Sequence, residues 1–221
     1  MQDIILFGPQ GSGKGTQAVY LKRRLRAKTI ATGEIARRLS NEDSANGREA
    51  KRILSAGDLL PDSLFLPAVE DALLKYHSAK HLIFDGFPRT LKQAKWLSYT
   101  LNQIGRPAPV AIILNITQAE AIKRLNKRLM CPVCHTTFNP RNTAYHNGVC
   151  PKDGAKLIRR SDDDPEVVRH RLHQYRLKSR GIKSFYRRRG DLVTVNGKGT
   201  ILAVWQRLQA AAEKALGERR D

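Results

Sequence analysis

A glycine-rich stretch near the start of the chain has the residue types and spacing of a phosphate-binding loop. It reads Gly8-Pro9-Gln10-Gly11-Ser12-Gly13-Lys14-Gly15-Thr16 and directly follows the apolar run at 4–7. Glycines let the backbone curl so that successive N–H groups point at a polyphosphate, and the positive end of a following helix adds to this field. Lys14 supplies a mobile positive charge for the β- and γ-phosphates, and Thr16 a hydroxyl near Mg²⁺. The segment predicts a phosphate site without saying which nucleotide it binds.

A second segment whose residues could bind metal and phosphate follows the apolar run at 82–84. It reads Phe84-Asp85-Gly86-Phe87-Pro88-Arg89-Thr90. Ligands of parallel sheets lie beyond the carboxyl ends of the strands, so Asp85 is expected to face the phosphate loop and to hold a magnesium-bound water. Gly86 permits a close backbone approach, and Arg89 is positioned for a phosphate.

The three cysteines of the chain lie in two short knuckles of equal spacing. These are Cys131-Pro132-Val133-Cys134 and Cys150-Pro151-Lys152-Asp153. Thiolates two residues apart can share one tetrahedral zinc, and cobalt or iron suits the same ligands. His135 and His146 lie in the same stretch, so the spacing leaves the fourth ligand open. An odd, clustered set of cysteines argues against a disulfide framework, and idle thiols are the alternative to a metal.

The elements that must position these residues alternate along the chain. Strands are expected at 4–7, 82–84, 111–114 and 192–195, and helices at 15–26, 64–76, 91–103 and 119–129. This alternation predicts an α/β fold with a parallel sheet and helices on both faces. Two stretches interrupt this alternation of strands and helices: a polar, helical one at 31–61 and a turn-rich one at 131–160. Both are expected to be small subdomains on the core.

The charge of the chain is unusually positive. Forty Lys and Arg residues against 20 Asp and Glu give a formal charge of +20. Nucleic-acid binding is one interpretation, but basic runs such as 22–24 and 187–189 carry no interleaved stacking aromatics, so we favour a site for phosphorylated substrates plus solvated surface. No apolar run approaches the ~20 residues of a membrane span, and no secretory signal is recognised, so we expect a cytoplasmic protein.

Five segments in a fixed order resemble one enzyme family. GPQGSGKGT, ATGEIARR, AGDLLPD, FDGFPRT and SDDDPEVVRHRL look like adenylate kinase over nearly the whole chain, and the cysteine-bearing stretch resembles the long, zinc-type lid. The resemblance implies transfer of the γ-phosphoryl group of Mg-ATP to AMP, giving two ADP, by a monomer without a specific nucleic-acid partner. It implies a P-loop kinase core at 1–30, 61–127 and 161–221, an AMP-binding subdomain at 31–60 and a lid at 128–160.

The resemblance also implies roles for individual residues. The set expected around ATP comprises Gly11, Ser12, Gly13, Lys14, Gly15, Thr16, Arg128, Thr137, Phe138 and Gly199. The set expected around AMP comprises Thr32, Arg37, Asp58, Leu59, Leu60, Gly86, Phe87, Pro88, Arg89, Gln93, Arg160 and Arg171. Charge neutralisation during transfer is expected from Lys14, Arg89, Arg128, Arg160 and Arg171. Similarity to lids with a final aspartate favours Asp153 as the fourth zinc ligand.

Two positions depart from the family pattern. Glu34 stands where an aspartate is usual, so the magnesium-water network of Glu34 and Asp85 is expected to differ in detail. Leu129 replaces a second hinge arginine, so phosphate binding near the hinge is expected to depend on Arg124, Lys127 and Arg128.

Two other functions compete with this interpretation. A kinase for another nucleoside monophosphate, such as UMP or CMP, has the same core, but Gln93 and Thr32 favour adenine. The charge and the four-ligand knuckle also suit a nucleic-acid-binding protein, although the knuckle lacks a recognition helix that could enter a groove of the duplex. We expect at most weak binding of polyanions to the surface. The sequence shows no Ser-His-Asp set, paired catalytic carboxylates or nucleophilic cysteine.

Overall fold

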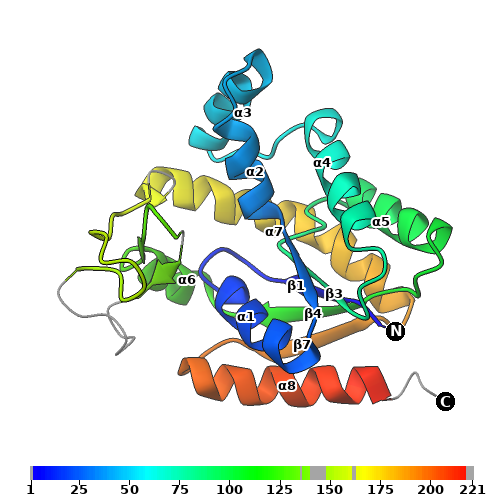
Figure 1. Cartoon of the computed structure of the whole chain (residues 1–221). Coiled ribbons are helices and arrows are strands. Elements are labelled where there is room, and N and C mark those ends of the chain that lie inside the picture. Colours follow the sequence, from blue (N-terminus) through cyan, green and yellow to red (C-terminus); the bar gives the residue numbers. More distant parts are fainter. Residues whose placement is uncertain (1, 135, 140–147, 161–162, 218–221) are drawn as a thin grey trace.

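The computed structural model describes residues 2–134, 136–139, 148–160 and 163–217. Five strands form one sheet: β1 (Ile4–Phe7), β2 (Lys28–Ala31), β3 (Leu82–Asp85), β4 (Val110–Asn115) and β7 (Leu192–Asn196). The helices are α1 (Lys14–Leu25), α2 (Thr32–Ser40), α3 (Ala45–Ser55), α4 (Asp62–Lys75), α5 (Leu91–Gln103), α6 (Gln118–Leu125), α7 (Pro165–Arg188) and α8 (Ile201–Gly217). Figure 1 shows the sheet at the centre of the molecule, with helices on either side.

The sheet is parallel throughout and has the strand order β2-β3-β1-β4-β7. β1 is central, with Ile4 opposite both Ile83 of β3 and Val110 of β4. A parallel sheet is covered on both faces, which explains why its central strands are nearly continuous apolar runs. The carboxyl ends of all five strands therefore meet at one edge, where the phosphate loop follows β1.

Alternate side chains of each strand enter two separate cores. Ile5 and Phe7 belong to the larger core, which also contains side chains of α4, α5 and α7. Ile4 and Leu6 belong to the other core, with side chains of α1 and α8. The predicted α/β fold, a parallel sheet with helices on both faces, is thus confirmed.

The predicted strands and helices are present in the structure and differ from it mainly at their ends, and β2, α7 and α8 are among the elements that were not predicted. The helix expected at 119–129 is wrong at its carboxyl end: α6 stops at Leu125, and Leu129 begins β5 (Leu129–Met130). β2 was not predicted, because Lys28 and Thr29 give its four residues no clear apolar pattern. β2 becomes a strand because its backbone pairs in parallel with β3.

Two insertions extend beyond the sheet and its helices. α2 and α3 form the first, which projects from the carboxyl end of β2 (Figure 1). The second contains β5 antiparallel to β6 (Thr137–Phe138) over a small core of Cys131, Phe138, Cys150 and Leu157. Residues 140–147, which include the alternative ligand His146, and residue 135 lie outside the described residues.

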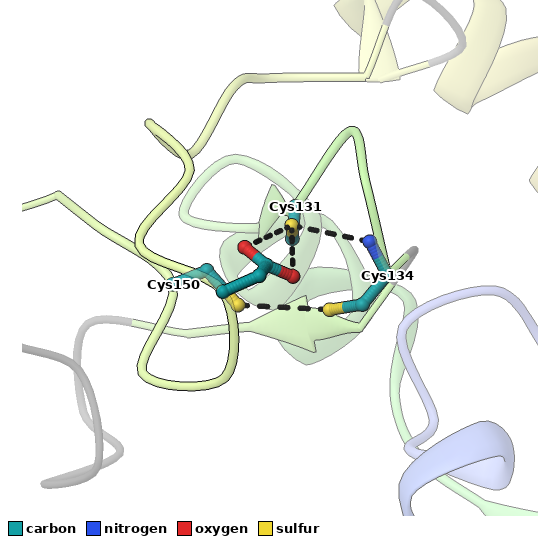
Figure 2. A group of neighbouring side chains, drawn as sticks. Cys131, Cys134 and Cys150 are labelled. Atoms are coloured by element: carbon teal, nitrogen blue, oxygen red, sulfur yellow. Dashed lines mark hydrogen bonds between the residues drawn. The ribbon is translucent and has the colours of Figure 1, made fainter.

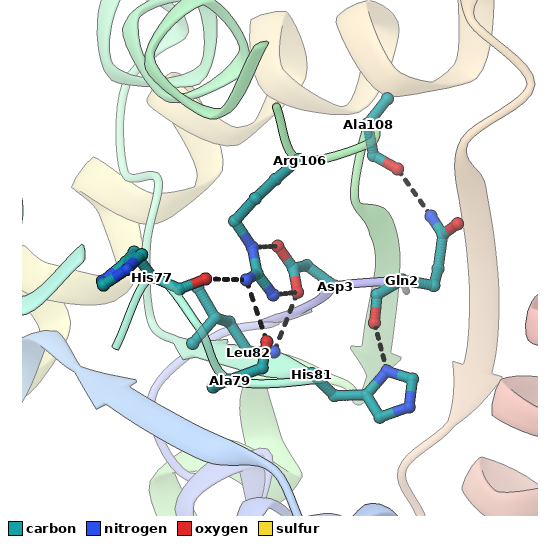
Figure 3. A network of polar contacts seen from close by, with 8 residues as sticks. All are labelled: Gln2, Asp3, His77, Ala79, His81, Leu82, Arg106 and Ala108. Atoms are coloured by element: carbon teal, nitrogen blue, oxygen red, sulfur yellow. Dashed lines mark hydrogen bonds and ion pairs between the residues drawn. The ribbon is translucent and has the colours of Figure 1, made fainter. Parts of the chain in front are cut away.

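A buried ion pair lies at the amino end of the sheet, since Asp3 comes directly before β1. Figure 3 shows this pair and its neighbours. Arg106 donates from Nε to Oδ2 of Asp3 at 2.8 Å and from Nη2 to Oδ1 at 2.6 Å. Its Nη1 donates to the carbonyl oxygens of His77 and Ala79, and Asp3 Oδ1 also accepts from the backbone N–H of Leu82. The side chains of Arg106 and Asp3 are 1% and 0% exposed. Asp3 lies before β1, Leu82 begins β3 and Arg106 lies before β4, so these bonds link the amino ends of three strands.

Candidate active site

The phosphate loop lies between β1 and α1 and has the backbone that its glycines predict. Gly8, Gly11 and Gly13 have φ values of 152°, 78° and 92°. A Cβ on Gly8 would lie 2.6 Å from the carbonyl oxygen of Leu114, so a larger residue does not fit there. α1 begins at Lys14, which places the positive end of the helix dipole at the loop.

The ammonium group of Lys14 turns back onto the loop. Its Nζ donates to the carbonyl oxygens of Gly8 at 2.7 Å and Pro9 at 2.9 Å. The pKa of Lys14 is lowered to about 8: burial is the main cause, Asp85 opposes the shift, and the charges of Arg89, Arg128 and Arg171 contribute to it. A buried cation among other cations is stabilised by an anion, so this site is built for a negatively charged ligand.

Asp85 lies at the carboxyl end of β3 and faces the start of α1. Its Oδ2 is 3.4 Å from the position that a Cβ on Gly15 would take. Burial raises the pKa of Asp85, Glu34 raises it as well, and Lys14, Arg89 and Arg37 oppose this rise. The structure therefore brings together the two carboxylates expected near Mg²⁺ and the cations expected near phosphates.

The segment after β3 forms a tight junction with α2. Thr32 Oγ1 donates to the carbonyl oxygen of Asp85 at 3.1 Å, and Arg89 Nε donates to that of Gly86 at 2.9 Å. A Cβ on Gly86, whose φ is 75°, would lie 3.1 Å from Thr32 Oγ1. Phe87 is fully buried in the larger core, and the Phe87-Pro88 peptide is cis. Phe87 thus anchors this segment through its ring and leaves its backbone to line the site.

Gln93 lies beneath this junction, in the first turn of α5. It is 3% exposed; its Oε1 accepts from the backbone N–H of Arg89, and its Nε2 donates to Asp62. Asp58, Leu59 and Leu60 lead into α4 just before Asp62. Asp58 Oδ1 is 2.7 Å from His170 Nε2, which links this stretch to α7. The residues expected around the AMP base therefore adjoin one another.

The hinge of the second insertion holds two arginines in fixed contacts. Arg128 forms a two-point ion pair with buried Asp163, and its Nε lies 2.7 Å from Oδ2. Arg124 donates to Glu120 at 2.7 Å and to the carbonyl oxygen of Gly197 at 2.9 Å, and its Nη1 lies 3.5 Å from that of Gly11. Arg124 thus joins the phosphate loop to the loop after β7, a role that its expected phosphate contact did not include.

The remaining nucleotide candidates lie on the second insertion and beside α6. Thr137 is exposed on β6, whereas Phe138 is 5% exposed and packs into the small core of the insertion. Arg160 precedes Asp163, whose N–H donates to the Arg160 carbonyl oxygen. Gly199, with a φ of 106°, lines a hollow of about 380 Å³ with Thr117, Ala119, Glu120, Lys123 and Lys198.

The cysteine knuckles converge with Asp153 into one cluster (Figure 2). One ligand atom from each of Cys131, Cys134, Cys150 and Asp153 lies within 4.8 Å of all the others. The sulfurs of Cys134 and Cys150 are 3.6 Å apart, and Cys131 Sγ is 3.3 Å from both Asp153 carboxylate oxygens. Two thiolates on one tetrahedral zinc, with Zn–S bonds of about 2.3 Å, lie roughly 3.8 Å apart. The donor set and its spacing therefore fit a tetrahedral metal.

Comparison of the sequence with known proteins points to one family. The family model described as adenylate kinase matches residues 6–191. The chain belongs to the adenylate kinase family. Among its relatives, the adenylate kinase of Oceanobacillus iheyensis is 35% identical over 213 residues, which cover 96% of this chain and 99% of that protein. Those of Methanosarcina barkeri and Trichlorobacter lovleyi are 35% and 37% identical, covering 96% and 95% of this chain and 99% and 98% of theirs.

Adenylate kinases transfer the γ-phosphoryl group of Mg-ATP to AMP and form two ADP. The chain is thus a nucleotide-binding phosphotransferase, as its motifs predicted. Within the described residues, no helix is both long and apolar enough to cross a bilayer. Sequence reasoning missed Asp62, Asp163 and the backbone contacts of Arg124, because each acts through a partner far away in the chain.

Proposed function

We propose that the chain holds Mg-ATP on the loop from Gly11 to Thr16 and AMP between α2 and the segment after β3. The γ-phosphoryl group then passes between them beside Lys14. The observation that carries this assignment is the shared electrostatic environment of Lys14, because Asp85, Arg89, Arg128 and Arg171 all act on its pKa. Asp85 ends β3, Arg89 follows it, Arg128 lies between α6 and β5, and Arg171 lies on α7, so charges from separate parts of the chain meet at the loop.

The chemistry requires alignment and positive charge more than a reactive side chain. The transferred group passes through a loose transition state with charge on its peripheral oxygens, and the acceptor phosphate is already an anion. Arginine suits this task, since its planar fork binds phosphate at two points and keeps its charge. Arg89 and Arg128 are fixed by Gly86 and Asp163, so their side chains need little further ordering. Arg37 holds the AMP phosphate, and Arg160 and Arg171 complete the cationic set.

The base-binding parts lie on opposite sides of the loop. Gly199 and the hollow beside α6 receive the ATP base, and Thr32, Asp58, Leu59, Leu60 and Gln93 receive the AMP base. Thr137 and Phe138 belong to the lid and come near the ATP ribose and base when the lid closes, with the Phe138 ring kept in the small core of the insertion. The subdomain at 31–60 and the lid at 128–160 close over the two nucleotides. Closure excludes water, which would otherwise accept the phosphoryl group and make the enzyme an ATPase.

The cysteine cluster binds one structural zinc and takes no part in the transfer. Cys131, Cys134, Cys150 and Asp153 supply four ligands, which close the coordination sphere to water. The small core of the second insertion is the reason for the metal, because so few buried side chains hold so short a sheet. Metal analysis of chelator-free protein should give one ion per chain. A ratio near zero would refute this proposal.

A coupled assay tests the proposed reaction. ADP formation should require ATP, AMP and Mg²⁺ together, and GMP, CMP and UMP should replace AMP poorly. A preference for UMP or CMP would mean that the chain is a different nucleoside monophosphate kinase. Hydrolysis of ATP at the same rate without AMP would refute the transfer itself.

The proposed function also includes a cellular compartment, an oligomeric state and a role for the surface charge. It acts as a cytoplasmic monomer on ATP, AMP and ADP, and its charge of +20 gives weak, salt-dependent binding of polyanions without sequence preference.

A further inference from the structure

The side-chain amide of Gln93 is held from both ends. The backbone N–H of Arg89 lies 2.8 Å from Gln93 Oε1, and Asp62 Oδ1 lies 2.8 Å from Gln93 Nε2. Asp62 begins α4, 31 residues before Gln93, and no local pattern joins the two. Gln93 is 3% exposed and the Asp62 side chain 23%, so water competes little for these bonds.

The chemistry of these partners permits one orientation of the amide. A backbone N–H only donates, so it requires the oxygen of Gln93; a carboxylate only accepts, so it requires the nitrogen. Rotating the amide by 180° would set donor against donor at Arg89 and acceptor against acceptor at Asp62. The orientation thus follows from the identities of the two neighbours.

A fixed amide can distinguish purines that a rotating amide cannot. The amide has two N–H donors and two acceptor lone pairs. Its bonds with Arg89 and Asp62 use one of each, so one N–H and one lone pair remain for the base. Adenine presents an acceptor at N1 beside the donor at its 6-amino group, whereas guanine presents a donor at N1 beside the acceptor O6. An amide that is free to rotate satisfies either base by turning over. A fixed amide satisfies one and opposes the other.

We propose that Asp62 is a specificity-determining residue, which makes the enzyme select AMP over GMP by fixing the orientation of the Gln93 amide. It acts through Gln93 and is therefore a positioning residue. The proposal rests on the AMP site assigned above, because it requires Gln93 to face the acceptor base.

Two other roles of Asp62 must be separated from this one. As the acidic residue in the first turn of α4, it stabilises that helix through the helix dipole. Its Oδ2 also lies 3.7 Å from Lys92 Nζ, a pair whose lysine is 81% exposed. Both roles bear on stability, and neither gives a reason for a change in base preference.

The test compares D62N with three further variants by kcat/KM for AMP and for GMP at saturating ATP. The asparagine of D62N can turn either its oxygen or its nitrogen toward Gln93, so it removes one of the two constraints and keeps the volume. D62S leaves Gln93 Nε2 without a charged acceptor and serves if D62N does not fold. K92Q removes the ion pair alone, and E166Q removes an exposed first-turn acid of α7 as the matched helix control.

In D62N a charge-assisted hydrogen bond that requires the Gln93 nitrogen gives way to a neutral one that either end of the Gln93 amide can make, and this should lower the AMP:GMP ratio about tenfold. The KM for AMP should rise and that for ATP should stay within about twofold of wild type, because the base lies away from the transferred group. K92Q and E166Q should keep the wild-type ratio.

A threefold or greater fall of the ratio in folded D62N or D62S, with both controls unchanged, would support the proposal. A smaller change, or an equal fall in K92Q, would overturn it. A wild-type enzyme that does not phosphorylate AMP would instead refute the proposed function.

Discussion

Replacing Asp3 by asparagine should destabilise the enzyme strongly without changing its chemistry. The carboxylate of Asp3 accepts three hydrogen bonds, two from Arg106 and one from the N–H of Leu82, and both charged side chains are essentially unexposed. D3N can keep the contacts at one oxygen. It loses the acceptor for Arg106 Nε and leaves the guanidinium charge buried without a counter-charge.

The size of the effect follows from this loss. Removing one partner of a buried ion pair costs about 3–5 kcal/mol. In a domain of this length each kcal/mol shifts Tm by about 2–4 °C, so D3N should melt about 6–20 °C below wild type. Activity at 25 °C should stay within about twofold, since Asp3 lies before β1 and the phosphate loop lies after it.

Urea denaturation and thermal melting of D3N test this expectation. E49Q is the control, because Glu49 pairs with Arg52 on the exposed face of α3 and its loss should leave Tm unchanged. If the free energy of unfolding of D3N is less than about 1 kcal/mol below that of wild type, the reasoning is refuted, since removing the partner of a buried charge should cost more than that. A large fall of kcat in folded D3N would refute the separation of stability from catalysis.

Two further predictions concern the site. Because the pKa of Lys14 is about 8 and bound phosphates favour its protonated form, ATP binding at pH 8 should take up about half a proton through Lys14. Calorimetry in two buffers of different ionisation enthalpy measures this uptake, which should vanish near pH 6.5; equal heats at pH 8 would contradict it. G57A should destabilise the enzyme more than G105A and lower its efficiency with AMP. Both glycines have a positive φ. A Cβ on Gly57 would lie 2.9 Å from Val167 and 3.0 Å from Arg171, whereas a Cβ on Gly105 would have no atom within 4 Å. Equal melting temperatures would show that the backbone strain alone matters.

The sequence was most informative where a function depends on neighbours in the chain. The loop from Gly8 to Thr16 and the placement of Asp85 at a strand end follow from local patterns, and so does the cysteine cluster. The loop and each cysteine knuckle need only residues within a few positions of one another, and Asp85 follows from a known rule for where parallel strands end. That the two knuckles share one site was predicted from their equal spacing.

The sequence was least informative where a bond joins distant segments. Asp3 and Arg106 are 103 residues apart, and only the folded sheet brings them together. Asp62 and Asp163 read as ordinary charged residues until their partners, Gln93 and Arg128, are in view. β2 depends on pairing with β3 in the same way, because its own four residues are too mixed to predict a strand.

The position of β1 at the centre of the sheet has a consequence for how such enzymes can change. β3 and β2 lie on one side of it, and β4 and β7 on the other. The parts assigned to the acceptor follow the first pair, and those assigned to the donor base follow the second. Substitutions that retune the acceptor base site should therefore combine additively with substitutions that retune the donor base site, because β1 separates the two sets of segments. The order of strands makes the two specificities separable units, so new pairs of substrates can be reached by changing one unit at a time.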